Sequence, residues 1–172
     1  MRQVALDTET TGLAPSEGHR VIEISCLEII DRALTGRYFH TYLQPERLID
    51  PAAAAVNGIS DAMLVGQPHF AEIASTLLNF VQGAELIIHN AAFDLGFLNQ
   101  ELSQLTPPRG PLESYCSIFD TLTLARTRHP GKDNSLEELC KRYRVCPLNP
   151  QQPAALRDAD ALARIYLAMT ES

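Results

Sequence analysis

Asp7 and Glu9 are the first residues of this chain whose types and spacing suggest chemistry. They follow the apolar run Val4, Ala5 and Leu6, which is typical of a short buried strand. Because side chains alternate between the two faces of a strand, both carboxylates point the same way. Such a pair repels itself unless a hard cation lies between the oxygens, and Mg²⁺ prefers oxygen ligands. The pattern indicates a divalent metal site, with a solvated acidic strand end as the alternative.

Two further aspartates lie where elements of secondary structure begin. Asp94 comes just after an apolar strand predicted over residues 86–88, and Asp158 lies early in the last predicted helix. In open α/β sheets, functional groups gather where buried strands end. Four carboxylates from three separate segments therefore suggest a two-metal centre of the nuclease or polymerase type. In such a centre one ion activates water and the other stabilises the leaving oxygen.

The elements that must position these acids predict an α/β fold, a mixed sheet flanked by helices. The opening strand, a second over residues 21–30 and a third over 37–43 form an antiparallel meander, and 86–88 is a buried parallel strand. Helices are predicted over residues 52–56, 69–82, 91–105, 118–126 and 135–143, and from about 154 onward. Asp120, near the start of the 118–126 helix, is interpreted as a cap and not as a metal ligand. The proline-rich segment 146–153 is expected to be irregular.

Composition indicates one ordinary domain. The chain has 172 residues, 45% of them hydrophobic, and no apolar run long enough to cross a bilayer. The N-terminus does not resemble a signal peptide, so we expect a cytoplasmic protein without membrane contact. The cysteines Cys26, Cys116, Cys140 and Cys146 form no C-x-x-C pair. Buried thiols are favoured over a metal shared by Cys140 and Cys146.

The net charge of −7 argues against a protein that holds nucleic acid by general electrostatics. It does not exclude an enzyme that grips nucleic acid locally. One region, residues 126–144, has a positive balance. A solvated helix pair is the favoured interpretation of that region, and a nucleic-acid contact is the alternative.

Three acidic motifs resemble those of the DEDD family of 3′–5′ exonucleases. They are LDTETTG at residues 6–12, HNAAFD at 89–94 and the DAD of the last helix at 158–160. Other stretches resemble the proofreading, or epsilon, branch of bacterial DNA polymerase III: EGH at 17–19, LTG at 34–36, FH at 39–40, GISD at 58–61, GAEL at 83–86, PGK at 130–132, NSL at 134–136 and IYLAMT at 165–170. The resemblance covers nearly the whole chain.

The resemblance implies a ribonuclease-H-like fold and a single exonuclease domain over residues 1–172. It assigns the metal positions to Asp7, Glu9, Asp94 and Asp158, which would hold two divalent ions, Mg²⁺ or Mn²⁺. It also implies that the DNA 3′ end, single-stranded or frayed, lies against a set of substrate-binding residues. These are Thr8, Gly12, Leu13, Val56, Asn57, His89 and Phe93. A structural histidine is the competing interpretation for His89, and core packing is that for Phe93.

This chain departs from the family where the family's polar catalytic groups stand. The general-base histidine, five residues before the last metal aspartate, is replaced by Pro153, and the tyrosine position of the sister branch is Ala154. A second active-site histidine is replaced by Asn57, and an acidic residue upstream of it by Ala52. Because losing a general base costs roughly 10²- to 10⁴-fold in rate, the resemblance predicts a slow enzyme.

The sequence leaves three functions open. The first is a proofreading-type exonuclease acting on a DNA 3′ end, working with the catalytic and accessory subunits of DNA polymerase III. The second is a catalytically impaired or inactive family member with a structural or partner-binding role. The third is an exonuclease that trims RNA. We expect residues 1–172 to lack the C-terminal tail by which the family is tethered to the polymerase.

Overall fold

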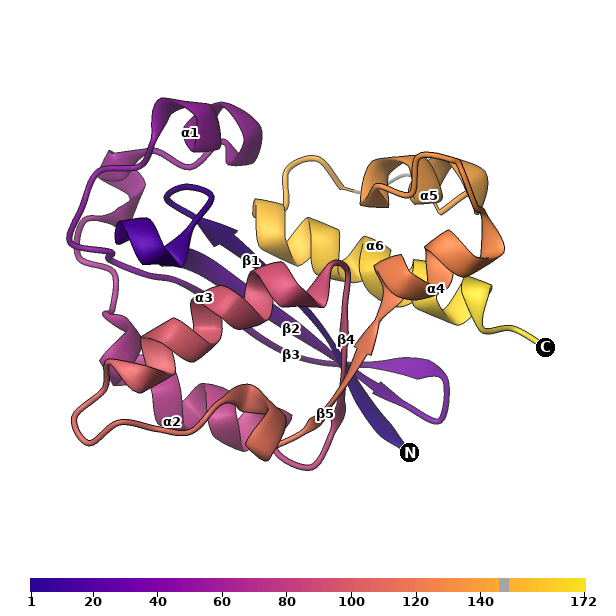
Figure 1. Cartoon of the computed structure of the whole chain (residues 1–172), viewed down its shortest axis with the longest axis horizontal. Coiled ribbons are helices and arrows are strands. Elements are labelled where there is room, and N and C mark those ends of the chain that lie inside the picture. The colour runs from indigo at the N-terminus through magenta and orange to yellow at the C-terminus, as the bar shows by residue number, and fades with distance from the viewer. Residues whose placement is uncertain (146–148) are drawn as a thin grey trace.

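In the computed structural model, residues 1–145 and 149–172 are described, and in this part of the chain six α-helices flank a five-stranded sheet (Figure 1). The strands are β1 (Arg2–Thr10), β2 (Val21–Ile30), β3 (Ala33–Tyr42), β4 (Glu85–Ile88) and β5 (Ser117–Asp120). The helices are α1 (Pro51–Asn57), α2 (Phe70–Val81), α3 (Ala91–Ser103), α4 (Thr121–Arg128), α5 (Leu136–Arg142) and α6 (Ala154–Met169). Short 3-10 helices occur at η1 (Pro15–Glu17), η2 (Asp61–Leu64) and η3 (Leu112–Ser114).

The sheet has the order β3-β2-β1-β4-β5. The first three strands pair antiparallel, whereas β4 runs parallel to β1 and β5 runs parallel to β4. The predicted meander and the predicted buried parallel strand are therefore confirmed. Because β1 and β4 are parallel, their carboxyl ends meet at one edge of the sheet, which is where the acidic motifs lie.

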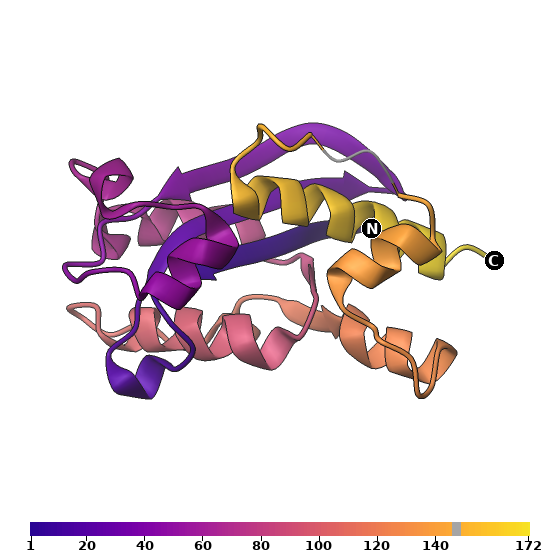
Figure 2. The same cartoon turned by 90° about the horizontal axis from the view of Figure 1, so that it is seen from above.

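Helices cover both faces of the sheet. Val4 and Leu6 of β1 belong to the core formed with α2 and α3, whereas Ala5 packs against Leu162 and Tyr166 of α6. Figure 1 and Figure 2 show α6 on one face and α2 and α3 on the other. Helices α4 and α5 pack against α6 through a separate apolar cluster. This alternation along β1 decides which face each acidic residue meets.

Two predicted boundaries are wrong. The helix predicted over residues 118–126 begins only at Thr121, because residues 117–120 form β5. Pairing with β4 overrides the local pattern here, since strand preference depends on tertiary context. The third strand begins at Ala33 and not at residue 37, because a tight turn at Asp31 and Arg32, with φ of 48° and 68°, closes the hairpin.

Several smaller expectations are tested by the described residues. Cys26, Cys116 and Cys140 are buried, as expected, whereas Cys146 lies outside the described residues, together with Pro147 and Leu148 of the segment predicted to be irregular. In the basic stretch, Lys141 pairs with its own helix's glutamates, which favours the solvated helix pair. No helix in the described ranges is long and apolar enough to span a bilayer.

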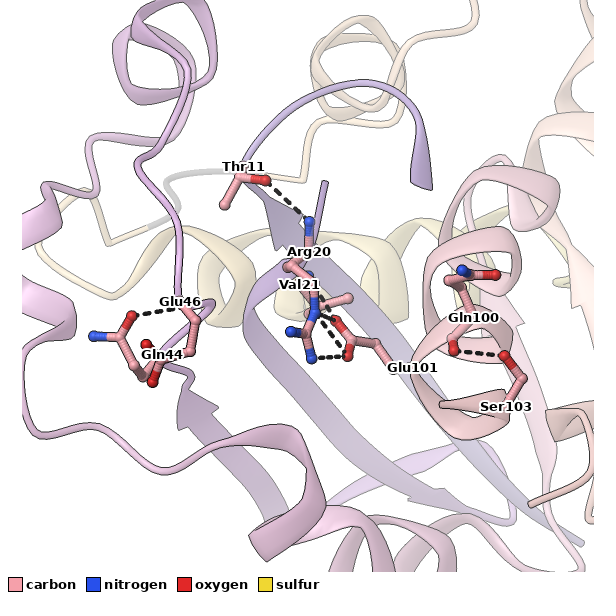
Figure 3. A network of polar contacts seen from close by, with 8 residues as sticks. All are labelled: Thr11, Arg20, Val21, Gln44, Glu46, Gln100, Glu101 and Ser103. Atoms are coloured by element: carbon pink, nitrogen blue, oxygen red, sulfur yellow. Dashed lines mark hydrogen bonds and ion pairs between the residues drawn. The ribbon is translucent and has the colours of Figure 1, made fainter. Parts of the chain in front are cut away.

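An ion pair fastens the start of β2 to α3. Figure 3 shows the Arg20 guanidinium against the Glu101 carboxylate. The Nε–Oε2 and Nε–Oε1 distances are 2.9 and 3.1 Å. Glu101 is only 3% exposed and also accepts the Val21 backbone N–H, while the Arg20 backbone N–H donates to Thr11 Oγ1. This contact therefore joins the β1–β2 connection to the helix that carries Asp94.

Removing Arg20 leaves the Glu101 carboxylate buried without its cation. We expect Arg20→Ala to lower the free energy of unfolding by about 2–3 kcal/mol, below the full cost of breaking a buried pair because Arg20 is partly solvated. Urea denaturation measures this change. Arg164→Ala is the matched control, because its pair with Asp160 is exposed on α6 and should contribute under about 0.5 kcal/mol. Equal losses in the two variants would contradict the assigned role of Arg20.

Candidate active site

Three carboxylates meet between β1 and the start of α6. Asp7 and Glu9 share the β1 face that Ala5 turns toward α6, and Asp158 lies in the second turn of that helix. One oxygen from each of the three lies within 4.8 Å of the others. Strand alternation brings the first two together, and the packing of α6 on the sheet adds the third.

Asp94 approaches from the other face, at the start of α3. It is 3% exposed, and its Oδ1 accepts a hydrogen bond from Thr8 Oγ1. Thr8 stands between Asp7 and Glu9 on β1, so its side chain points to the α3 side. The structure therefore places Asp94 beside the three-carboxylate cluster and not within it, held by the intervening residue of the same strand.

Asp120 fixes the helix that presents Asp94. Its side chain accepts the backbone N–H of Leu122 at 2.8 Å, which caps α4. The same carboxylate accepts the N–H groups of Asn90 and Ala91, both at 3.1 Å, at the start of α3. The interpretation of Asp120 as a cap is confirmed, and it extends to two helices.

Burial raises the pKa values of all four acids, and nearby carboxylates add to the rise. Burial, and then repulsion from the other carboxylates, raises the pKa of Asp7 well above its usual value and that of Glu9 to about 8. Burial raises the pKa of Asp94 to about 7, although the bond from Thr8 opposes this change. Burial also raises the pKa of Asp158, while nearby Arg157 opposes it. A cation among these oxygens would relieve the repulsion.

The donor set fits a divalent metal ion. Among the described residues, Asp7 Oδ2 and Ser25 Oγ are the buried side-chain polar atoms that lack a hydrogen-bond partner. An unpaired carboxylate oxygen in a buried site is costly unless a cation binds it. Carboxylate oxygens also suit Mg²⁺ or Mn²⁺ better than they suit soft metals. Asp7, Glu9 and Asp158 would hold such an ion, with Asp94 next to them.

A cavity of about 350 Å³ opens beside Glu9. Six of the seven predicted substrate-binding residues line it: Thr8, Gly12, Leu13, Val56, Asn57 and Phe93. Ala52, at the position where the resemblance implies an acidic residue, lines the same cavity. Leu13 and Val56 are each 84% exposed, although both are apolar. The cavity therefore offers apolar contacts next to the carboxylates.

The His89 side chain forms hydrogen bonds within the protein. Its Nε2 lies 2.8 Å from the carbonyl oxygen of Asn134, and its Nδ1 lies 2.9 Å from Thr121 Oγ1. Because a carbonyl only accepts, Nε2 carries the proton that is donated there. Burial lowers the pKa of His89, which favours the neutral ring. Both ring nitrogens are thus engaged, as the structural interpretation expects, and His89 does not line the cavity beside Glu9.

Gly12 is needed because a side chain of the protein itself approaches it. A Cβ at this position would lie 2.3 Å from Cε1 of His19, whose ring packs over the glycine. Thr11 Oγ1 and Asp50 hold that ring at 2.9 and 3.3 Å. A glycine at this position therefore leaves room for the His19 ring, and Gly12 also lines the cavity beside Glu9.

Glu23 and Arg157 are site residues that the sequence patterns did not single out. Glu23 is fully buried and lies opposite Glu9 in the β1–β2 register. A charged residue inside the apolar strand over residues 21–30 was a signal for it. Arg157 lines a second cavity of about 450 Å³, together with Asn57 and Pro153. Both positions where the resemblance implies a histidine thus line this second cavity. Val56 and Asn57 line the second cavity and the cavity beside Glu9.

Comparisons with known proteins agree with this geometry. Residues 4–166 match the exonuclease family RNase_T. The chain is 48% identical to the DNA polymerase III epsilon subunit of Escherichia coli, over 98% of this chain and 71% of that protein. It is similar to the structure of exonuclease X in complex with 5′-overhanging duplex DNA, with a TM-score of 0.75 and 25% identity over 97% of this chain and 90% of that one.

A further solved structure shares the fold at lower identity. It is a 3′-exonuclease described by its recognition of the 3′ end of a histone mRNA stem-loop, with a TM-score of 0.79 and 16% identity, covering 98% of this chain and 63% of that one. The mixed five-stranded sheet with helices on both faces is the ribonuclease-H-like fold expected from the sequence. With the family match over residues 4–166 and 48% identity to an epsilon subunit, this chain belongs to the exonuclease family RNase_T.

Proposed function

We propose that this protein is a proofreading-type 3′–5′ exonuclease that hydrolyses the terminal phosphodiester of DNA with two divalent ions. The observation that carries the proposal is the meeting of Asp7, Glu9 and Asp158 within 4.8 Å, with Asp94 held beside them by Thr8. The family match and the identity to an epsilon subunit support the reaction class.

The protein's own groups have distinct tasks in this proposal. The metal ions would be held by Asp7, through its unpaired Oδ2, and by Glu9, Asp158 and Asp94. When bound, such ions polarise the scissile phosphate and lower the pKa of the attacking water. The cavity beside Glu9 receives the 3′-terminal nucleoside against Leu13, Val56 and Phe93. These apolar contacts orient the terminal phosphate toward the carboxylates.

The proton of the attacking water has no obvious acceptor at the family's base position. Pro153 has no titratable group and forms the N-cap of α6, and Asn57 is neutral. Pro153 and Asn57 line the same cavity, and neither side chain can accept a proton in place of the missing base. We therefore propose weak activity, with better turnover in Mn²⁺ than in Mg²⁺.

A second candidate function rests on the same observation. A protein that keeps the metal carboxylates but lacks the base positions suits a structural or partner-binding subunit. Relatives are named as subunits of DNA polymerase III. We propose that this protein likewise associates with the catalytic and accessory subunits of DNA polymerase III, in the cytoplasm.

Identity to these relatives favours DNA over RNA as the substrate, because the likeness to the histone mRNA exonuclease extends to the fold alone.

Replacing Asp7 tests the metal site. We expect Asp7→Ala to abolish or greatly weaken Mn²⁺ binding in the presence of a nucleoside monophosphate, because it removes the buried oxygen that has no protein partner. Isothermal titration calorimetry measures this binding. Asp160→Ala, on the same helix as Asp158 and paired with Arg164, is the control and should bind like the wild type. Mn²⁺ binding by Asp7→Ala identical to that of the wild type would contradict the proposal.

Metal-free stability should fall as the pH rises. The pKa of Glu9 is about 8 in the folded protein and near its usual 4.5 when unfolded, so the folded state binds more protons between these values. The free energy of unfolding therefore decreases as pH rises from about 4.5 to about 8. Asp94, with a pKa of about 7, adds to this trend.

Thermal melting in a chelator at about pH 5.5 and about pH 8 measures this trend. We expect a lower Tm at the higher pH, and added Mn²⁺ should raise Tm more at that pH because the ligands are then ionised. In Glu9→Gln the slope should be shallower. A metal-free Tm that is independent of pH would contradict the raised pKa of Glu9.

Restoring a base tests the assignment of position 153. We expect Pro153→His to raise turnover on single-stranded DNA, up to roughly 10²-fold, and addition of Asn57→His to raise it further. The gain should appear in kcat rather than KM, because a base acts on the chemical step. Digestion of end-labelled DNA with Mg²⁺ or Mn²⁺ measures it. Rapid Mg²⁺-dependent turnover by the unchanged protein would overturn the proposed role of this position.

A further inference from the structure

The first turn of α6 directly precedes the turn that carries Asp158, and it has no cap of its own. The N-cap is Pro153, and no side chain of the cap residue accepts a bond from the helix. The first N–H groups of any helix lack partners within it, and a side-chain oxygen at the N-cap usually accepts one from the second or third residue. In α6 the second residue is Ala155, which is fully buried. Its N–H needs an acceptor from elsewhere.

Glu23 supplies that acceptor from β2. Its Oε1 accepts the Ala155 N–H at 3.0 Å, across 132 residues of sequence. Its Oε2 lies 2.7 Å from Nε2 of His40 on β3, and the Glu23 side chain has no exposed surface. Both carboxylate oxygens are therefore engaged by the protein. Glu23 thus differs from Asp7, which keeps one buried oxygen without a partner.

The position of Glu23 links two of the proposed metal ligands. Glu9 is its direct neighbour across the β1–β2 ladder. Ala155 precedes Asp158 by three residues, so the two lie on the same side of α6, one turn apart. A bond from Glu23 to Ala155 therefore fixes the distance between the strand that carries Glu9 and the helical turn that carries Asp158.

Apolar packing does not do this alone. The apolar cluster that joins α6 to the sheet includes Leu162, Ala163 and Tyr166, which lie in the middle and at the far end of the helix. The buried side chains of the first turn, Ala154 and Ala155, are short. The bond to Glu23 therefore adds a directional contact at the end of α6 where the buried side chains are short.

We propose that Glu23 is a positioning residue that caps α6 from β2, is oriented by His40, and holds Asp158 at the distance from Glu9 that metal binding requires. The inference rests on the proposed metal site, and it assigns Glu23 no contact with the ion or the substrate. It predicts that the reach of the Glu23 side chain matters more than its charge.

Conservative variants of Glu23 separate reach from charge. Glu23→Asp keeps the carboxylate but shortens the side chain by one methylene, so it cannot bond both Ala155 and His40. Glu23→Gln keeps the reach and an oxygen acceptor but loses the charge. Glu28→Asp is the matched control, because Glu28 is a buried glutamate of the same strand that pairs with Arg2, away from the site. Calorimetric Mn²⁺ titration, circular dichroism and Tm are measured for all.

We expect Glu23→Asp to weaken Mn²⁺ binding about 10- to 100-fold, as is typical when a group that orients a metal ligand is lost. Glu23→Gln should bind Mn²⁺ nearly as well as the wild type, and Glu28→Asp should lose stability without losing affinity. If Glu23→Asp does not fold, His40→Phe serves in its place, and a lower Mn²⁺ affinity in a folded protein is expected.

The outcomes distinguish this inference from the proposed function. If the wild-type protein binds no Mn²⁺, the metal site itself is wrong. If the wild type binds Mn²⁺ and Glu23→Asp, or His40→Phe in its place, binds it equally well, the positioning role is overturned. The role is also overturned if Glu23→Gln loses as much affinity as Glu23→Asp, because charge and not reach would then be decisive.

Discussion

Repulsion among clustered, partly buried carboxylates is the constraint on which the rest of this structure depends. Asp7, Glu9 and Asp158 lie within 4.8 Å of one another, and Asp94 is close enough to raise the pKa of Asp7 further. Such an arrangement costs free energy in the absence of a cation, so the surrounding fold must hold it together. In the proposed function, a hard divalent ion would offset this cost once the acids are ionised.

The fold meets this cost by fixing each acid from a different direction. Strand β1 carries two of them on one face, and its intervening residue Thr8 reaches through to hold Asp94 on the other. Asp120 ties down the N-terminus of α3, which presents Asp94. Asp120 and Glu23, which lie outside the carboxylate cluster, thus accept backbone N–H groups near it. Polar contacts of this kind orient ligands that apolar packing leaves free.

The two cavities divide the tasks of the proposed reaction. The cavity beside Glu9 has apolar residues at its rim, which suits the terminal nucleoside. The neighbouring cavity contains Asn57 and Pro153, neither of which can accept a proton at neutral pH, together with the cation Arg157. Val56 and Asn57 line both cavities, so the base positions adjoin the proposed substrate cavity, whereas the clustered carboxylates come from β1 and α6. A chain can therefore retain the carboxylates while it lacks the base.

Much of the fold was predictable because its signals are local. The meander, the buried strand β4 and the helices α2 and α3 follow from side-chain periodicity, and periodicity depends only on neighbours in sequence. Strand β5 was not predictable in this way. Its residues 117–120 form a strand only because β4 lies beside them, and the local pattern equally suits a helix.

The same distinction applies to the candidate site. That Asp7 and Glu9 share a face is decided by the sequence alone, since the period of a strand is two residues. The motifs likewise indicated the family, and the resemblance implied six residues that the structure brings around one cavity. Whether Asp158 or Asp94 completes the cluster, and that Glu23 caps α6, was decided only by the tertiary structure. These contacts join residues far apart in the chain, and their distances exist only once the helices have packed on the sheet.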